Sequence, residues 1–204
     1  MTVWFYDGCR AVVNTLVYGI VPPRRKMTDQ LSAKDWLDQG LKTLAERGFT
    51  ALKAEPLAKA LGVSRGSFYW HFADIGAFQT AILKHWREVA AEQIIANLEA
   101  ASDHDDPVAL LLRQAFGGRL SLENAVRTWA TVDPAARSAV QAIDRRRLGY
   151  VETLLGASGL PADVARPRAQ ILYWAFLGFA RSDKPLPRAR QQAVLDELLR
   201  MASR

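Results

Sequence analysis

Cysteine is almost absent from this sequence, since Cys9 is the single one among 204 residues. A lone cysteine excludes a disulfide within the chain and is typical of a reducing compartment, so we expect a cytoplasmic protein. Histidine is also scarce, and its three residues are too scattered along the chain to hold a metal ion. We therefore expect no metal site and no cofactor.

Long hydrophobic runs and the common catalytic patterns are missing as well. The apolar run 11–21 is too short and too interrupted to cross a bilayer, and its basic residues follow it, unlike those of a signal peptide. The sequence has no phosphate-binding glycine loop, nucleophile elbow or zinc-type spacing. The acidic group 103–106 precedes Pro107 and indicates a solvated loop and helix cap more simply than an acid–base cluster. Neither a membrane protein nor an enzyme is predicted.

Basic residues are in excess, and hydrophobic residues make up half of the chain. The formal net charge of +6 and the isoelectric point near 9.7 favour association with polyanions. A chain of 204 residues with 50% hydrophobic content can bury a proper core, and its length fits one small and one medium domain.

Residues 57–72 combine two helical patterns with a glycine turn between them. Leu57 and Leu61 lie on one face of the first pattern. Gly62 can adopt the left-handed conformation that ends a helix, and Ser64 is a favourable N-cap for the second helix. This order of signals predicts a helix-turn-helix.

The second helix of this motif has aromatic residues on more than one side. Phe68 and Phe72 are one turn apart and are expected to face the core. A core role for every aromatic is the simpler alternative, but aromatics at four of five successive positions cannot all point inward on a helix. The opposite and flanking positions are Gly66, Ser67, Tyr69, Trp70 and His71. Because small residues let a helix N-terminus approach base edges and phosphates, and Arg65 suits a guanine edge, the pattern predicts DNA binding.

A supporting helix precedes the motif. Ser32 and Asp35 have the spacing of a capping box, and Gly48 is the expected end of this helix. The next helix is expected to start near Lys53, because Pro56 is tolerated only in a first turn. The apolar stripe of the supporting helix consists of Trp36, Leu37, Leu41, Leu44 and Ala45.

From Asp35 to about Leu83 the sequence resembles the N-terminal domain of the tetracycline-repressor (TetR) family of transcriptional regulators. The resemblance rests on the sequence ERGF at 46–49 and on LAKALGVSRGSFYWHF at 57–72. It implies a three-helix DNA-binding domain, an all-helical ligand-binding and dimerisation domain behind it, and release of DNA when a small molecule binds.

The resemblance also implies which residues contact DNA, and it shows two departures. Members of the family usually have Ser or Thr at the start of the domain's second helix, where this chain has Lys53. They usually have Lys just after the third or recognition helix, where this chain has Ile75. Lys53 and Lys84 are the candidates to replace the missing phosphate anchor. The implied groove-facing and phosphate-facing set is Ser64, Arg65, Gly66, Ser67, Tyr69, Trp70 and His71.

The first 26 residues form a poorly defined extension with two open interpretations. The basic residues 24–26 could form an arm that enters the minor groove, as in other helix-turn-helix proteins. Alternatively, Met27 is the natural start, which we favour because clean helix signals begin only at Ser32.

The rest of the chain is predicted to be helical, without strand-like alternation. A long pattern from Asp74 to about Ala101 predicts one continuous helix, which by the resemblance transmits effector binding to the DNA-binding helices. A helix that merely packs as a connection is equally consistent with these residues. Further helices are predicted at Pro107 to Phe116, Leu120 to Ala130, Pro134 to Leu155, Ala162 to Arg181 and Arg188 to Met201.

The last two predicted helices indicate a homodimer. Residues 171–179 are apolar nearly all round the helix, which requires cover on more than one side. With the apolar stripe at 194–201 they would form half of a four-helix bundle, completed by a second subunit. The two recognition helices would then lie about one DNA turn apart, roughly 34 to 36 Å, on a palindromic operator.

A small-molecule pocket is predicted only as a set of candidates. Aromatic residues with polar tips suit such a pocket, although in helical domains they more often form the core. Glu123 and Arg127 lie near this set in sequence, and we interpret them as an ion-paired helix face. The candidate effector-pocket residues are Trp129, Tyr150, Tyr173, Trp174 and Phe176.

Taken together, the sequence predicts an all-α, dimeric, TetR-like regulator, more often a repressor than an activator. The expected division is a DNA-binding domain at 27–83 and an effector-binding and dimerisation domain at 84–204. The expected partners are double-stranded DNA, a small-molecule effector and a second copy of the chain. The alternative is a helical architectural or partner-binding protein that uses Tyr69 and Trp70 against another protein and has no effector response.

Overall fold

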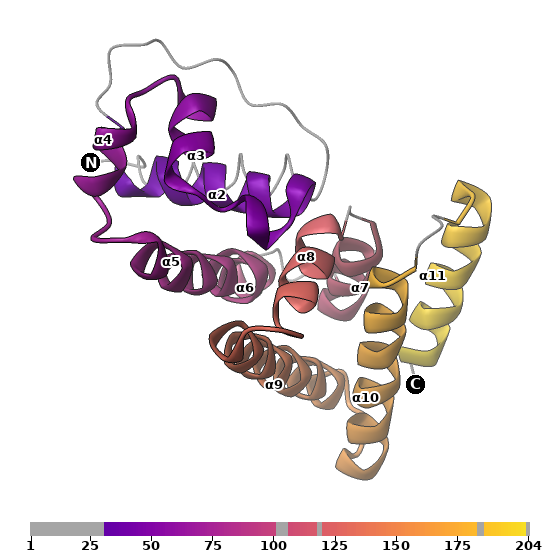
Figure 1. Ribbon diagram of the computed structural model, residues 1–204. Helices are drawn as coiled ribbons and strands as arrows, with labels where there is room; N and C mark the ends of the chain where they lie inside the picture. The colour runs from indigo at the N-terminus through magenta and orange to yellow at the C-terminus, as the bar shows by residue number, and fades with distance from the viewer. Residues whose placement is uncertain (1–30, 101–105, 118–119, 183–185, 203–204) are drawn as a thin grey trace, which may run out of the picture. The chain divides into compact units, whose positions relative to one another are not determined.

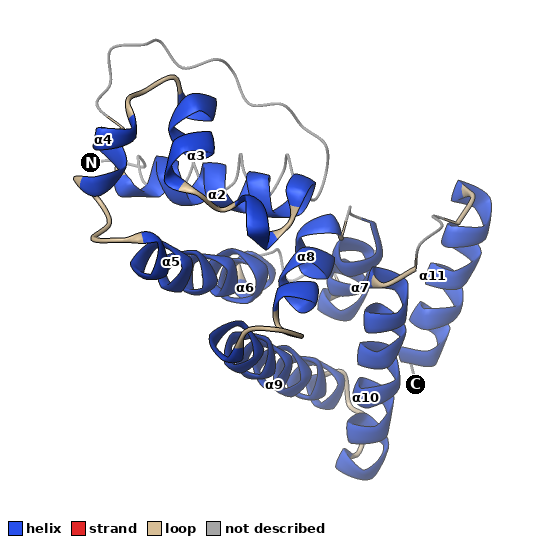
Figure 2. Ribbon diagram, viewed as in Figure 1, coloured by secondary structure: helices blue, strands red, loops and turns tan. Residues whose placement is uncertain are grey.

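The structure is a computed structural model that describes residues 31–100, 106–117, 120–182 and 186–202 (Figure 1). All regular elements within these ranges are helices (Figure 2), so the predicted all-α class is confirmed. The α-helices are α2 (Ala33–Arg47), α3 (Ala54–Leu61), α4 (Arg65–Tyr69), α5 (Ile75–Arg87), α6 (Gln93–Glu99), α7 (Pro107–Gly117), α8 (Ser121–Trp129), α9 (Pro134–Ala157), α10 (Ala162–Ala180) and α11 (Arg188–Ala202). A 3₁₀ helix occupies Phe49–Ala51, and a π-helical turn occupies Glu88–Glu92.

The described residues divide into two compact units. The first contains residues 31–90 and 120–141, and the second contains the described residues from 91 to 117 and from 142 onwards. Helices α2 to α5 and α8 belong to the first unit, whereas α6, α7, α10 and α11 belong to the second. Helix α9 contributes residues to both. The predictions for the N-terminal extension and for Asp103 to Asp105 lie outside the described residues.

Helix α2 begins with the predicted capping box. The Ser32 hydroxyl accepts a hydrogen bond from the Asp35 backbone N–H at 3.4 Å, and the Ser32 backbone N–H donates to the Asp35 carboxylate at 2.9 Å. Gly48 follows the helix with a φ of 76°, a backbone conformation that residues other than glycine rarely adopt. Local sequence therefore determines both ends of this helix.

The core of the first unit is built around α2, which packs against α3, α5 and α8. Trp36, Leu41 and Leu44 are fully buried on it. Gly40 lies where α2 meets α5, and a Cβ atom at this position would overlap the Ile82 side chain. The absence of a side chain thus permits the close approach of the two helices.

The long helix predicted after Asp74 contains a π-helical turn. The chain runs from α5 through Glu88–Glu92 into α6 and leaves the helix after Glu99, close to the expected end at Ala101. Within this turn, Val89 and Ala91 are both buried. The predicted regular helix is therefore interrupted at this point by a wider turn.

Helix α8 belongs to the first unit with the helix-turn-helix. Its last residue, Trp129, stacks on Phe49 with ring planes 2° apart and ring centroids 5.9 Å apart. The Arg127 side chain donates to the Glu123 carboxylate at 2.7 Å, which agrees with the interpretation of an ion pair along one helix face. Trp129 is therefore part of the core around α2.

In the second unit, aromatic side chains join α7 to α10. The Phe116 ring centroid lies 6.3 Å from that of Phe176 and 5.3 Å from that of Phe179. Helix α11 packs against both of these helices, and the Gln191 amide donates to the Phe116 carbonyl at 2.5 Å. Over the described ranges, no helix has the length and apolarity needed to span a bilayer.

Candidate nucleic-acid interface

The turn between α3 and α4 has the geometry of a helix-turn-helix (Figure 1). Gly62 adopts the left-handed conformation with φ 72° and ψ 26°, and the Val63 backbone N–H donates to the Ala58 carbonyl at 3.0 Å. Ser64 is extended and precedes α4 as its N-cap by position, but its side chain makes no capping hydrogen bond. The turn is therefore fixed by the backbone of Gly62 and Val63, and the Ser64 hydroxyl does not help to fix it.

The inward side of α4 is held by one fully buried aromatic residue. Phe68 makes an edge contact with Trp36 of α2, with ring centroids 5.4 Å apart, and another with Phe78 of α5 at 5.2 Å. Phe72 is also buried and packs on Phe68 at 5.3 Å. Because α4 has only five residues, these contacts determine its tilt.

The outward side of α4 is exposed and rich in hydrogen-bonding and aromatic groups. Trp70 is 88% exposed and Tyr69 is 48% exposed. Gly66 is also exposed, while Ser67 and His71 are half-buried. The structure thus brings the predicted set together on one short helix and its ends.

Gly66 has no packing function in this structure. A Cβ atom there would meet only the Ser64 hydroxyl oxygen, at an ordinary contact distance of 3.7 Å. Glycine in a helix costs about 0.5–1 kcal/mol relative to alanine. At the exposed start of α4, the missing side chain would also let another molecule approach the backbone closely.

Arg65 and Tyr69 interact along the exposed face of α4. The Arg65 guanidinium donates a hydrogen bond to the Tyr69 hydroxyl at 3.2 Å, and its Cζ atom lies 5.8 Å from the centroid of the ring. This hydrogen bond raises the pKa of Arg65 above its usual value. The guanidinium therefore stays charged and has a defined neighbour.

The predicted phosphate contacts lie on different elements. Lys53 is exposed at the N-cap position of α3, and Lys84 is exposed near the end of α5. Ile75, at the position where the family usually has Lys, is 37% exposed and begins α5. Lys53 is thus the candidate cation closest in the chain to the helix-turn-helix.

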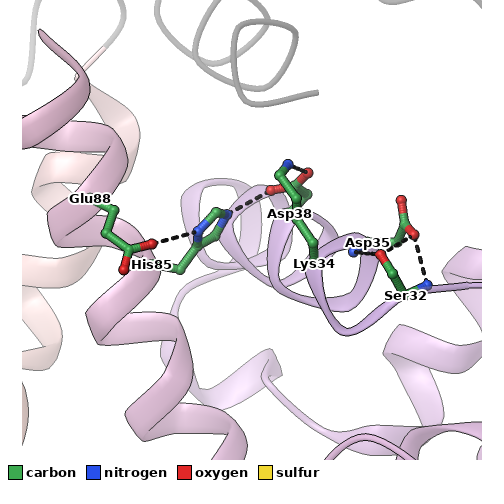
Figure 3. A network of polar contacts seen from close by, with 6 residues as sticks. All are labelled: Ser32, Lys34, Asp35, Asp38, His85 and Glu88. Carbon is green, nitrogen blue, oxygen red and sulfur yellow. Dashed lines mark hydrogen bonds and ion pairs between the residues drawn. The ribbon is translucent and has the colours of Figure 1, made fainter. Parts of the chain in front are cut away.

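A polar network ties α2 to α5 behind the interface (Figure 3). The His85 Nε2 atom lies 2.7 Å from one Asp38 carboxylate oxygen, and Lys34 donates to the other oxygen at 2.7 Å. Glu88 is the second acidic neighbour, with its carboxylate 3.8 Å from His85 Nδ1. Sequence reasoning missed this network, although an isolated histidine at 85 among the buried positions 82, 83 and 86 was an available signal.

Residues 37–78 match the family model for bacterial regulatory proteins of the tetR family. This range covers most of α2, the whole helix-turn-helix and the start of α5. These residues therefore form a DNA-binding domain of the tetR-family type. Members of the TetR family are transcriptional regulators and not enzymes, and the helix-turn-helix described above is their DNA-binding element.

Solved structures share the fold of this chain. A transcriptional regulator from Saccharomonospora viridis in complex with choline has a TM-score of 0.65 and 15% identity, covering 82% of this chain and 95% of its own. Reduced NemR of E. coli has a TM-score of 0.60 and 20% identity, with 83% and 96% coverage. The multidrug binding protein EbrR complexed with imidazole has a TM-score of 0.54 and 24% identity, with 83% and 96% coverage. No curated protein matches the chain in sequence.

The five candidate pocket residues occupy different environments. Trp129 is buried in the first unit. Tyr173 and Phe176 are buried neighbours in the second unit, with ring centroids 5.9 Å apart. Tyr150 is half-buried on α9, whereas Trp174 is 63% exposed on α10. The structure therefore brings Tyr173 and Phe176 together and leaves Trp174 on the surface.

Two charged residues of α9 adjoin this buried pair. The Tyr173 hydroxyl donates to the Asp144 carboxylate at 2.6 Å, and the Arg147 guanidinium carbon lies 5.3 Å from the Phe176 ring centroid. Burial also raises the pKa of Tyr150, which favours its neutral phenol. The second unit thus places both signs of charge and neutral hydroxyl groups among aromatic rings, a combination that small-molecule sites use.

Proposed function

We propose that this TetR-family regulator acts as a repressor that binds a near-palindromic operator as a homodimer and leaves it when a small molecule binds. The observation that carries the proposal is the division of α4 into a buried side at Phe68 and an exposed side around Trp70. A helix fixed by its inner face and open on its outer face suits insertion into the major groove.

The proposed DNA contacts separate base recognition from phosphate binding. Arg65 has the donor geometry for the O6 and N7 atoms of a guanine. Lys53 carries an exposed charge at the start of α3 and is assigned to a phosphate. The remaining proposed contacts on the exposed face and its edges are Ser64, Gly66, Ser67, Tyr69, Trp70 and His71.

The proposed dimer uses the exposed apolar surface of α10 and α11. Ile171 and Trp174 on α10 and Val194 and Met201 on α11 are all exposed in the single chain. Water-exposed apolar side chains on two neighbouring helices favour burial against another copy of the same pair. Two DNA-binding domains held this way would contact half-sites about one turn, roughly 34 to 36 Å, apart.

The proposed effector site lies in the C-terminal part, within residues 84–204, and the DNA-binding part within 27–83. Support comes from the aromatic and charged cluster of Asp144, Arg147, Tyr173 and Phe176. Relatives of the same fold have been solved with choline and with imidazole. Of the other candidates, Tyr150 lies in the same unit, on α9, whereas Trp129 is buried in the first unit and Trp174 is exposed.

Selection of bound duplexes from random DNA tests the proposal. We expect one near-palindrome to be preferred over bulk DNA by about a thousandfold or more. Arg65→Ala should reduce discrimination at one base-pair position by roughly 5- to 150-fold, whereas Lys53→Ala should weaken all sequences alike. Arg113→Ala, which removes an equal charge from the exposed surface of α7, is the control. Binding without sequence preference would instead favour the alternative, an architectural or partner-binding protein.

The same duplex tests the effector and the direction of regulation. Transcription from a promoter that contains the selected sequence should fall when the protein is added. Choline and imidazole are the first probes for release of the duplex, because relatives have been solved with them. Higher transcription in the presence of the protein would contradict the assignment as a repressor.

A further inference from the structure

We propose that Tyr69 is a positioning residue for Arg65, whose guanidinium it holds in place for base recognition before DNA arrives. This inference rests on the proposed function, in which Arg65 recognises a guanine. It assigns the Tyr69 hydroxyl to the arginine, and not to the DNA backbone. The two residues would then act as one unit.

The first step is the geometry of the pair. Arg65 and Tyr69 are four residues apart on α4, so their side chains lie above one another on the same face. The guanidinium donates to the Tyr69 hydroxyl at 3.2 Å and also lies within the range of a cation–π contact, at 5.8 Å from the ring centroid. Two different interactions therefore restrict the same side chain.

The second step is the anchoring of the tyrosine ring. Tyr69 makes an edge contact with Phe68, with centroids 5.3 Å apart and planes at 82°. Phe68 is fully buried between Trp36 and Phe78. The ring that holds Arg65 is thus attached to the core of the first unit, although it is itself half-exposed.

The third step concerns the donors that remain on the guanidinium. An arginine has five N–H donors in a planar fork, and a guanine edge accepts two of them. One donor to Tyr69 leaves enough for the bidentate contact. Because a free arginine loses much rotamer freedom when it is ordered, a guanidinium that is already ordered binds DNA more tightly.

A double-mutant cycle on DNA affinity tests the inference. The four proteins are the original chain, Tyr69→Phe, Arg65→Ala and the double variant, each measured against the selected duplex and its single base-pair substitutions. Tyr69→Phe keeps the ring and removes only the hydroxyl. We expect it to weaken the selected duplex by about two- to tenfold, mostly at the base pair assigned to Arg65, and by less than about twofold in the Arg65→Ala background. Thermal unfolding of each variant verifies that it is folded.

Three outcomes would overturn the inference. If Tyr69→Phe weakens every sequence equally and by the same factor in both backgrounds, the hydroxyl contacts DNA directly. If Tyr69→Phe has no effect while Arg65→Ala still relaxes one position, the pair is not a unit. If Arg65→Ala itself weakens all sequences equally, base recognition by Arg65 in the proposed function is wrong, which is a different result from the first two.

Discussion

Gly66 illustrates how a single residue can serve binding at the expense of folding. It lies in the first turn of α4, where an added Cβ atom would meet only the Ser64 hydroxyl oxygen, at an ordinary contact distance. Gly66→Ala should stabilise the fold by about 0.4–1 kcal/mol, because alanine restricts the unfolded chain and fits the native backbone. The same methyl group should weaken binding of the selected duplex by keeping the helix away from DNA.

Thermal unfolding and duplex titration measure these two opposite effects in the same variant. Gly149→Ala is the control, since Gly149 lies on α9 and an added methyl group there would have no neighbour within 4 Å, so this variant should gain stability without losing affinity. Unchanged affinity in Gly66→Ala would show that DNA does not approach this position.

The hydrogen bond between Asp38 and His85 gives a second prediction for a single residue. His85 is buried at 5% exposure and Asp38 lies 2.7 Å from its Nε2 atom. Asp38→Ala should destabilise the fold by about 1–3 kcal/mol, because a buried polar atom loses its partner. The midpoint of urea unfolding measures this loss.

Glu88→Gln is the matched control on the other side of the imidazole. The Glu88 side chain is 55% exposed and its carboxylate is 3.8 Å from Nδ1, so its removal should cost less than about 0.5 kcal/mol. Equal losses in the two variants would contradict the view that Asp38 is the essential partner.

At the scale of elements, the ends of the helices were the most predictable part of the fold. Ser32 and Gly48 enclose α2 as predicted, and Gly62 ends α3 with the expected left-handed backbone. These signals are local, because caps and glycine turns depend on a few neighbouring residues. The division of α4 into a buried and an exposed side followed from helical periodicity for the same reason.

Features that depend on long-range packing were not predictable. The π-helical turn Glu88–Glu92 lies where the chain passes from the first unit into the second, and no local sequence signal indicated it. The stacking of Trp129 on Phe49 joins residues 80 positions apart. Of the candidate site, the sequence could predict which residues of α4 point outward, because that depends on helical periodicity alone.

The contact of α2 with α5 yields a prediction at the same scale. Gly40→Ala should destabilise the first unit by about 1–3 kcal/mol, because its Cβ would overlap Ile82 and lie 2.8 Å from the Phe78 ring. The urea midpoint of this variant measures the effect. Gly40→Ala combined with Ile82→Val should recover part of the loss, and a stable Gly40→Ala variant would mean that the helices can separate without cost.

For the whole molecule, the exposed apolar surface of α10 and α11 determines the expected assembly. Trp174→Asp should convert the proposed dimer into a monomer, because it places a charge where an apolar surface would be buried. Light scattering after size-exclusion chromatography measures the mass. Affinity for a two-half-site duplex should fall steeply, since each half-site would be bound independently.

Val132→Asp is the control for this change. Val132 is 65% exposed in the turn after α8, so the variant also adds a charge at an exposed apolar position but lies outside α10 and α11. A monomeric Val132→Asp variant, or a Trp174→Asp variant that stays dimeric, would contradict the proposed interface.

Among the tryptophans that the structure describes, two exposed ones are natural optical probes. Trp36, Trp86 and Trp129 are buried. Trp70, the C-cap of α4, and Trp174, on α10, are exposed to water. Indoles in contact with water emit at longer wavelengths and are quenched by iodide. Loss of iodide quenching at Trp70 would follow operator occupancy, and the same loss at Trp174 would follow subunit pairing, so both equilibria can be recorded without an attached dye.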